Sequence, residues 1–239
     1  MRLKPPFLLL LAISLWFAHS LAAADSVPKI PPDQLVDVQD VVPGVILDIR
    51  YATDDNFLKR KLYPTAKCYL RNAVARRLIR VQDLLKKQGL GLKIWDGYRP
   101  LSVQKQMWAI LSDPDYVADP SYGSRHNRGA AVDVTLVDKS GHELVMPTHF
   151  DDFTPAAHVD APCRNQTAAK NRQILQDTMQ LAGFESMPTE WWHFDAPEWR
   201  GYKVLDIPFS TIESGNPELA KTQYSGEAVP LIQQNSPSH

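Results

Sequence analysis

The feature that most constrains this chain is a largely apolar run, residues 130–137, that carries one carboxylate. Its residues alternate as in a β-strand, which places Ala131, Asp133 and Thr135 on one face and mainly aliphatic side chains on the other. A carboxylate inside an otherwise buried strand is costly unless it meets a cation or hydrogen-bond donors. The run therefore predicts a central strand with a charged site on one face.

Two short motifs supply side chains that complement Asp133. His126 precedes the strand, and Gly129 between them permits a sharp or bulged backbone. Glu190 and His193 follow much later in the chain. A catalytic zinc usually takes three protein ligands, keeps a fourth position for water, and needs a nearby carboxylate to accept that water's proton. These residues predict His126, Asp133 and His193 as metal ligands, with Glu190 as the base.

The sequence leaves the local structure at Glu190 open. Glu190 and His193 are three residues apart, which puts them on one face of a helix but on opposite faces of a straight strand. The two intervening tryptophans favour a strand with a bend or loop at Glu190. A single His followed by an Asp is more often structural than catalytic. The metal site is therefore indicated by the two motifs together.

The same motifs resemble those of the zinc D-alanyl-D-alanine dipeptidases of the vancomycin-resistance type, which belong to the peptidoglycan D,D-peptidases. The resemblance rests on S-R-H-N-R-G-A-A-V-D at 124–133 and E-W-W-H at 190–193, and it extends to residues 51–57, 95–100 and 150–151. It implies an α+β fold of the D,D-peptidase and hedgehog-like type, with helices packed around a small, mainly antiparallel sheet that carries a zinc site. It also implies one Zn²⁺ per chain and cleavage of a free D,D-dipeptide.

The resemblance assigns roles to four residues outside the metal set. Arg99 precedes a proline and so projects from an extended turn; by itself it suggests a pair with Asp96 or a surface acid. The resemblance instead makes Arg99 the cation that stabilises the oxyanion. Asp151 corresponds to the carboxylate that recognises the free amino group of the substrate. Tyr51 and Ser124 correspond to substrate contacts, although Ser124 can also simply cap a turn.

Apolar spacing and turn residues predict the remaining elements. Helices are expected over 69–88, from about residue 100 onward, and over 165–182. Strands are expected at 45–50 and 92–95, and a hairpin turn at 138–141 should return the chain over 143–146.

Residues 1–24 have the three-part pattern of a secretory signal peptide: Arg2 and Lys4, an apolar run from Phe7 to Phe17, and Leu21-Ala-Ala-Ala24. The alternative, a membrane anchor, is disfavoured because the apolar run is shorter than the ~20 residues that span a bilayer. No cysteine follows the small residues, so a lipid anchor has no attachment point. We therefore expect a periplasmic or secreted protein without a stable membrane anchor after cleavage.

The rest of the chain is long enough for one compact domain and short for two. We expect a zinc dipeptidase domain over 25–208 and a flexible tail over 209–239, where Ser, Gly, Pro, Gln and Asn predominate. Without Arg2 and Lys4, the 26 basic residues become 24 against 27 acidic ones, a formal net charge of −3. The sequence also shows neither a basic groove nor an extended aromatic and basic stripe, which disfavours nucleic acid as a partner. The resemblance implies a small peptide substrate as the partner.

Two cysteines, Cys68 and Cys163, leave a disulfide and two buried thiols equally open.

Three functions compete on this evidence. The first is hydrolysis of D-alanyl-D-alanine or similar dipeptides during wall turnover. The second is a D,D-carboxypeptidase acting on stem peptides, which Asp151 disfavours because such a substrate has no free amine at that position. The third is a non-catalytic, metal-holding wall-binding domain, which would need neither Glu190 nor Arg99. An exported enzyme cannot readily deplete a cytoplasmic precursor pool, so scavenging is favoured over glycopeptide resistance.

Overall fold

The computed structural model describes residues 30–114 and 116–215. The chain divides into two units, Met1–Pro31 and Pro32–His239, and every element named below belongs to the second. Its centre is a five-stranded sheet, whose order is β2 (Ile46–Leu47), β4 (Gly91–Asp96), β5 (Ala131–Val137), β7 (Glu190–Asp195) and β6 (Glu185–Met187). β2 pairs with β4 in parallel and the other neighbours are antiparallel, so the predicted α+β fold with a mainly antiparallel sheet is confirmed.

β5 is the central strand that the apolar run predicts. Each of its residues is buried, as expected for a strand with neighbours on both sides and cover on both faces. Its register places Asp133 opposite Asp96 of β4 on one side and opposite His193 of β7 on the other. The sheet therefore collects ionisable side chains at one end of its three middle strands.

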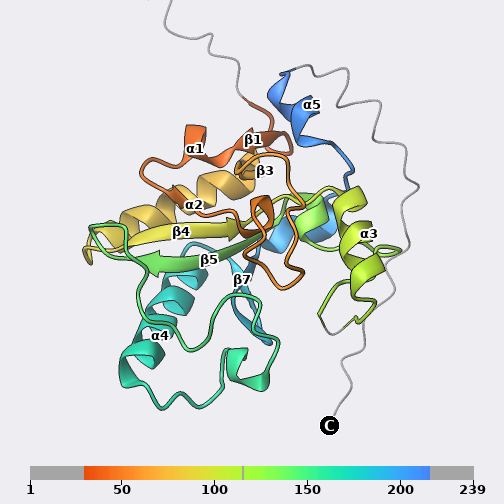
Figure 1. The fold of residues 1–239 in the computed structure, drawn as a ribbon. Helices are drawn as coiled ribbons and strands as arrows, with labels where there is room; N and C mark the ends of the chain where they lie inside the picture. Colours follow the sequence, from red (N-terminus) through yellow and green to blue (C-terminus); the bar gives the residue numbers. More distant parts are fainter. Residues whose placement is uncertain (1–29, 115, 216–239) are drawn as a thin grey trace, which may run out of the picture. The chain divides into compact units, whose positions relative to one another are not determined.

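Two long helices pack on this sheet and on each other (Figure 1). They are α2 (Asn72–Lys86) and α4 (Gln166–Leu181), close to the predicted helices over 69–88 and 165–182. α2 begins later than predicted because Tyr69–Arg71 forms a strand, β3, that pairs with β1 (Leu35–Asp37). The main-chain donors of these three residues are thus engaged in strand pairing and in loop contacts rather than in a helical turn.

The shorter elements complete the chain. They are α1 (Val38–Val41), η1 (Arg50–Ala52), α3 (Leu101–Ile110), η2 (His126–Arg128), η3 (Pro155–Ala157), η4 (Pro197–Gly201) and α5 (Phe209–Glu213). The strand predicted at 45–50 is reduced to β2, and the segment predicted to return over 143–146 makes one antiparallel bridge, Val137 to Glu143.

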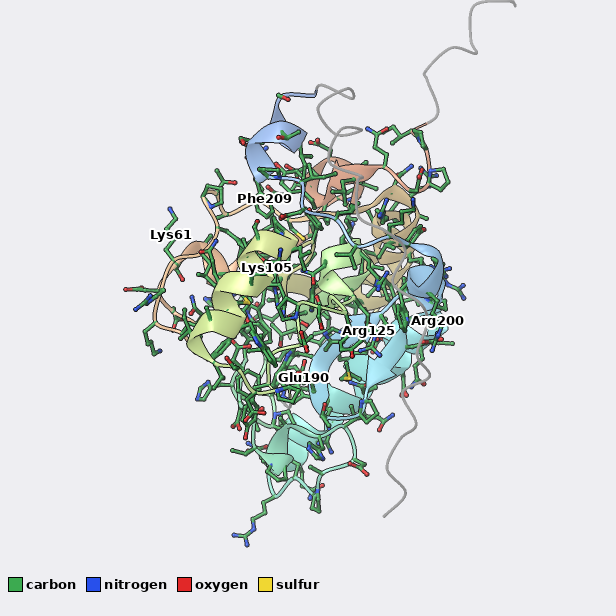
Figure 2. The ribbon with its side chains drawn as sticks, turned by 90° about the vertical axis from the view of Figure 1, so that its right-hand side faces the viewer. Lys61, Lys105, Arg125, Glu190, Arg200 and Phe209 are labelled. Carbon is green, nitrogen blue, oxygen red and sulfur yellow. The ribbon has the colours of Figure 1, made fainter. Side chains whose placement is uncertain are left out.

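α5 corrects the predicted boundary of the tail. The sequence places the end of the domain at residue 208, but Phe209 is buried at 2 % exposure. Its ring lies 5.0 Å from the ring centroids of both Tyr63 and Tyr69, at the end of α5 that faces the body of the domain (Figure 2). This aromatic anchor outweighs the polar composition of the neighbouring residues. Residues 216–239 and the predicted signal peptide, 1–24, lie outside the described residues.

Both cysteines are unpaired: Cys68 is buried and Cys163 is half-buried. Neither the disulfide nor the pair of buried thiols is therefore present in the structure. Within the described ranges, none of the helices combines the length and apolar character that a membrane span requires.

Replacing the anchor of α5 should destabilise the whole domain. Phe209→Ala removes a buried aromatic ring, for which we expect a loss of about 3 to 5 kcal/mol in the free energy of unfolding. Chemical denaturation measures this value, with the exposed neighbour Ser210→Ala as the control that should change little. Equal stability of the two variants would show that α5 is not part of the cooperative unit.

Candidate metal centre and active site

The structure brings the three predicted metal ligands together. His126 lies in η2, Asp133 on β5 and His193 on β7, and one ligand atom from each lies within 4.8 Å of the others. His193 Nδ1 is 3.0 Å from Asp133 Oδ1 and 3.2 Å from His126 Nε2, and His126 Nε2 is 3.5 Å from Asp133 Oδ2. All three side chains are buried. This cluster could hold a metal ion.

Gly129 ends the short η2 turn that presents His126 to the cluster. It adopts the left-handed conformation with φ of 65°, and its N–H donates to the carbonyl oxygen of His126. A Cβ atom at this position would lie 2.7 Å from Leu35 Cδ2. The predicted requirement for glycine beside His126 therefore has both a conformational and a steric cause.

Each imidazole has an inner nitrogen that faces the cluster and an outer nitrogen that faces away from it. The outer nitrogen of each ring lies within hydrogen-bond distance of an acceptor, which indicates where a neutral ring carries its proton. His126 Nδ1 lies 2.8 Å from the carbonyl oxygen of Gly97, and His193 Nε2 lies 2.9 Å from Asp195 Oδ1. Both partners are acceptors, so each ring in its neutral form would carry its proton on the outer nitrogen and present a lone pair on the inner one. With both rings neutral, two lone pairs and the carboxylate of Asp133 would converge. Such a donor set fits a divalent metal ion that accepts nitrogen and oxygen ligands.

The charges around the cluster favour the ionised forms of both Asp133 and His193. Burial by itself would raise the pKa of Asp133, but His126 and His193 hold that pKa well below its usual range. Burial by itself would lower the pKa of His193, yet the carboxylates of Asp195 and Asp133 raise it well above the ordinary value. The cluster thus favours a positive charge at its centre, and a bound metal would displace the proton from His193.

Glu190, labelled in Figure 2, begins β7, and the pairing of β7 with β6 is irregular next to it. Met187 pairs with Glu190, whereas Ser186 pairs with Phe194, so β7 bulges between the two pairs. The bulge brings Glu190 Oε2 to 3.8 Å from His193 Nδ1. Of the two conformations that the sequence leaves open, the bent strand is therefore the one observed.

Glu190 is also accessible from outside the cluster. Its side chain retains 24 % exposure and lines a cavity of about 300 Å³ together with Tyr116, Phe153 and His158. Burial raises the pKa of Glu190, while the neighbouring His193 opposes the rise. A carboxylate that is accessible, close to the ligands and of raised pKa is suited to accept a proton from water.

Arg99 is buried and held by two partners. Its Nε and Nη2 donate to Asp96 Oδ2 at 3.2 and 2.6 Å, and its Nη1 donates to Gln104 Oε1 at 2.9 Å. The pair with Asp96 is the structural role that the sequence allows for Arg99. These contacts use three of the five N–H donors that an arginine carries. The guanidinium also lies over the ring of Tyr51, 5.1 Å from its centroid.

Asp151 faces the site from a strained backbone position. Its φ is 58°, a left-handed conformation that Asp tolerates better than most residues. The hydroxyl of Tyr51 donates to Asp151 Oδ1 at 3.2 Å and lies 3.3 Å from Oδ2. Burial raises the pKa of Asp151 well above its usual value, Asp133 and Glu190 add to the rise, and Arg99 opposes it. This carboxylate would gain from a cationic partner.

Tyr51 and Ser124 have structural contacts of their own. Tyr51 is buried at 3 % exposure, where its ring packs against Phe150 and its hydroxyl orients Asp151. Ser124 Oγ accepts from the N–H of Asn127 at 3.1 Å, which is the turn-capping role that the sequence allows. Their predicted contacts with substrate stay predictions.

Two residues near the site, Gln104 and Asp195, are not named by the sequence analysis, and Asp96 is named there only as an alternative partner of Arg99. Asp96 is fully buried and accepts hydrogen bonds from Tyr63, Gly97 and Arg99. Gln104 holds the other end of Arg99. Asp195 orients His193, and its second oxygen forms an ion pair with Arg125 at 3.0 Å. A sequence signal existed for Asp195, because residues two apart on a strand share a face and Asp195 follows His193 by two.

The chain is similar to known proteins. The D-ala-D-ala dipeptidase family matches residues 32–212. A D-alanyl-D-alanine dipeptidase of Escherichia coli K12 is 35 % identical over 177 residues, which cover 74 % of this chain and 92 % of the relative. The enzyme of the same description from Enterococcus faecium is 31 % identical over 178 residues, 66 % of this chain and 88 % of the relative.

A solved structure, that of the LD-carboxypeptidase LdcB, aligns with 81 % of this chain and covers 78 % of its own length. The two structures give a TM-score of 0.41, and the sequences are 19 % identical.

Removing any of the three clustered ligands should remove the metal. His126→Ala, Asp133→Ala and His193→Ala each leave two protein ligands, and we expect each purified variant to lose stoichiometric metal by elemental analysis. The exposed His142→Ala serves as control and should keep the metal content of the wild type. A variant that retained stoichiometric metal and full activity would exclude its residue from the site.

Removing the carboxylate behind His193 should weaken the metal site without abolishing it. Asp195→Ala deletes the acceptor that fixes the ring, and we expect metal affinity to fall by about 10- to 100-fold in a chelator competition titration. Asp195→Asn keeps an acceptor oxygen and should lose less. Glu185, an exposed carboxylate opposite Asp195 on β6, gives the control Glu185→Ala. Equal affinities in Asp195→Ala and Glu185→Ala would mean that Asp195 does not orient His193.

Proposed function

Because the chain belongs to the D-ala-D-ala dipeptidase family, we propose that it uses zinc to hydrolyse D-alanyl-D-alanine, or a similar short D-containing dipeptide, to free amino acids. Membership makes the protein a dipeptidase; the substrate and the metal are the proposal. The observation that carries it is the buried cluster of His126, Asp133 and His193 with Glu190 3.8 Å from His193 Nδ1.

The donor set supports zinc in particular. Two imidazoles and one carboxylate are ligands that catalytic zinc accepts. Neither Cys68 nor Cys163 belongs to the cluster, so no thiol takes part. Bound there, zinc would act as a Lewis acid toward a peptide carbonyl and lower the pKa of a nearby water. One Zn²⁺ per chain follows from one such cluster in the described part of the chain.

Glu190 is proposed as the general base. It lies at the edge of the cluster and opens to the cavity of about 300 Å³, so it can take the proton of an attacking water and later deliver it to the leaving amine. Its pKa, raised by burial, moves toward the operating range for proton transfer.

Arg99 is proposed to stabilise the negative charge that develops on the carbonyl oxygen. Its guanidinium is permanently charged, and Asp96 and Gln104 fix its orientation before substrate arrives. Preorganised donors of this kind contribute about 3 kcal/mol to transition-state stabilisation. Arg99 also lowers the pKa values of Glu190 and Asp151, which supports its closeness to both carboxylates.

Asp151 is proposed to hold the free amino group of the dipeptide, with Tyr51 and Ser124 as further substrate contacts. Asp133 and Glu190 raise the pKa of Asp151, and Asp133 also raises the pKa of Glu190. A metal ion can compensate the first two, and the substrate's ammonium group can compensate the third. A peptide without a free amine would leave Asp151 uncompensated, which supports a dipeptidase over a D,D-carboxypeptidase.

We propose that this reaction takes place in the periplasm or outside the cell and serves peptidoglycan turnover. The support is the signal-peptide pattern of residues 1–24 and the substrate itself, because D-alanyl-D-alanine is a wall constituent. Secretion of a reporter fused to residues 1–24 would test the export step separately.

Loss of the base should separate chemistry from metal binding. Glu190→Gln keeps the size of the side chain but cannot accept the proton, so we expect kcat to fall by about 10²- to 10⁴-fold while zinc content stays at one per chain. Thr189→Ala, the exposed neighbour in the same cavity, should leave kcat within a factor of a few. Substantial turnover by Glu190→Gln would assign the base to another residue.

The proposed role of Asp151 makes the free amine essential. N-acetylation of D-Ala-D-Ala removes the charge and adds bulk, so we expect it to abolish cleavage. Asp151→Asn keeps the shape of the side chain and removes its charge. A hydrogen bond to a charged group contributes ~1.5 to 3 kcal/mol, so kcat/KM for the free dipeptide should fall by about one to two orders of magnitude.

The control is Asp152→Asn, a neighbouring carboxylate whose Oδ1 accepts from its own turn at Thr154. It should leave kcat/KM unchanged. A panel of D-Ala-D-Ala, L-Ala-L-Ala, N-acetyl-D-Ala-D-Ala and a pentapeptide stem, with and without a chelator, completes the test. If the acetylated dipeptide and the stem were cut as fast as the free dipeptide, a D,D-carboxypeptidase would replace the dipeptidase.

A further inference from the structure

We propose that the protein binds a small oxyanion, a carboxylate or a phosphate group, in a cavity at the opposite end of the sheet from the metal centre. β4 and β5 are antiparallel, so Gly91 at the start of β4 lies beside Val137 at the end of β5, on the left of Figure 1. Asp96 and Asp133 lie at the other end of the same strands. At about 3.3 Å per residue, the two ends of β4 are about 17 Å apart.

The cavity has a volume of about 270 Å³ and is walled by the ends of β2, α2, β4 and β5. Glycines such as Gly44 and Gly89 form much of its rim, and both have positive φ. This volume is several times larger than the ≈ 30 Å³ that one water molecule occupies in the liquid. A carboxylate or phosphate group therefore fits in it.

Gln82 supplies a buried donor to this cavity. The residue is 2 % exposed, and its Oε1 accepts from the N–H of Leu92 at 2.8 Å, which fixes the orientation of the amide. Its Nε2 consequently points the other way, 3.8 Å from where a Cβ of Gly44 would lie. No acceptor for Nε2 is found among residues 30–114 and 116–215. Nε2 can therefore donate to a ligand oxygen or a water in the cavity.

Two lysines favour an anionic ligand over water alone. Lys86 of α2 and Lys139 after β5 both line the cavity, and neither forms an ion pair with any described residue. The stem of Lys139 lies over Gly89, with Cε 2.7 Å from where a Cβ would be, and Lys86 Cε lies 4.0 Å from the corresponding position at Gly44. The glycines thus let both stems lie along the rim. Two ammonium groups and an amide N–H₂ form a set of donors.

Asp138, the acidic residue that lines the cavity, carries one negative charge against the two positive charges of Lys86 and Lys139. Asp138 Oδ1 accepts from the N–H groups of Ser140 and His142 at 2.7 and 3.0 Å, and Oδ2 lies 3.6 Å from the ring of His142. This carboxylate is therefore engaged in its own turn. The other polar side chains that line the cavity, Gln82, Lys86 and Lys139, offer donors and two cations, which match the acceptor oxygens of an oxyanion. The inference does not depend on the proposed function, because no residue is shared between the two sites.

The test is a titration of the zinc-loaded full chain with inorganic phosphate and, separately, with acetate, at constant ionic strength, followed by ¹H–¹⁵N correlation NMR. We expect saturable shifts of the Gln82 side-chain amide and of the Gly89 and Gly91 backbone amides. These signals are distinct from those of residues around His126, so binding of phosphate to the metal is recognised separately. The ion with the higher affinity tells whether a phosphate-bearing or a carboxylate-bearing ligand is preferred.

Matched variants decide whether the cavity is responsible. The double variant Lys86→Gln/Lys139→Gln changes two exposed side chains, so it should fold normally and bind the preferred ion about tenfold or more weakly. Lys87→Gln, which removes an exposed lysine next to Lys86 but outside the cavity, should bind like the wild type. Gln82→Glu keeps the acceptor for Leu92 and should also abolish binding. Absence of saturable shifts with both ions, or equal affinity in the double variant, would overturn the proposal.

Discussion

The structure depends on charge compensation inside the sheet: the carboxylate of Asp133, in the buried strand β5, faces the imidazole rings of His126 and His193, which hold its pKa well below the usual range. Burying several acceptors together is unfavourable by several kcal/mol unless a cation joins them. The register of the sheet builds this cluster, because it places His193 of β7 directly opposite Asp133. A metal ion is the simplest group that completes it.

The surroundings of the cluster keep these two rings in place. The carbonyl oxygen of Gly97 holds one ring and Asp195 holds the other, while Asp96 ties Arg99 to the same end of β4. The site then carries more negative charge than its own arginine can offset, since Glu190 and Asp151 are added to Asp133. This excess suits an active site that takes up two cations, a metal ion and the ammonium group of a dipeptide.

Much of this arrangement is predictable from sequence, because its main causes are local. The apolar alternation around Asp133 identifies the central strand, and a buried carboxylate requires partners that His126 and His193 can provide. The bend at Glu190 could not be settled, since it arises from a bulge in the pairing of β6 with β7. For Asp96 the sequence offers only the nearby Arg99 as a partner, because Tyr63 reaches Asp96 through the fold. The end of the domain was placed too early, because a single apolar residue, Phe209, outweighs the composition around it.

The central claim, that the inner nitrogens of both histidines are kept as metal ligands, is tested most directly by long-range ¹H–¹⁵N NMR of the histidine rings during titration with zinc. The account predicts that one equivalent of zinc shifts Nε2 of His126 and Nδ1 of His193, with the protons on His126 Nδ1 and His193 Nε2. Zinc that left both rings unchanged, or that bound through the outer nitrogens, would contradict it.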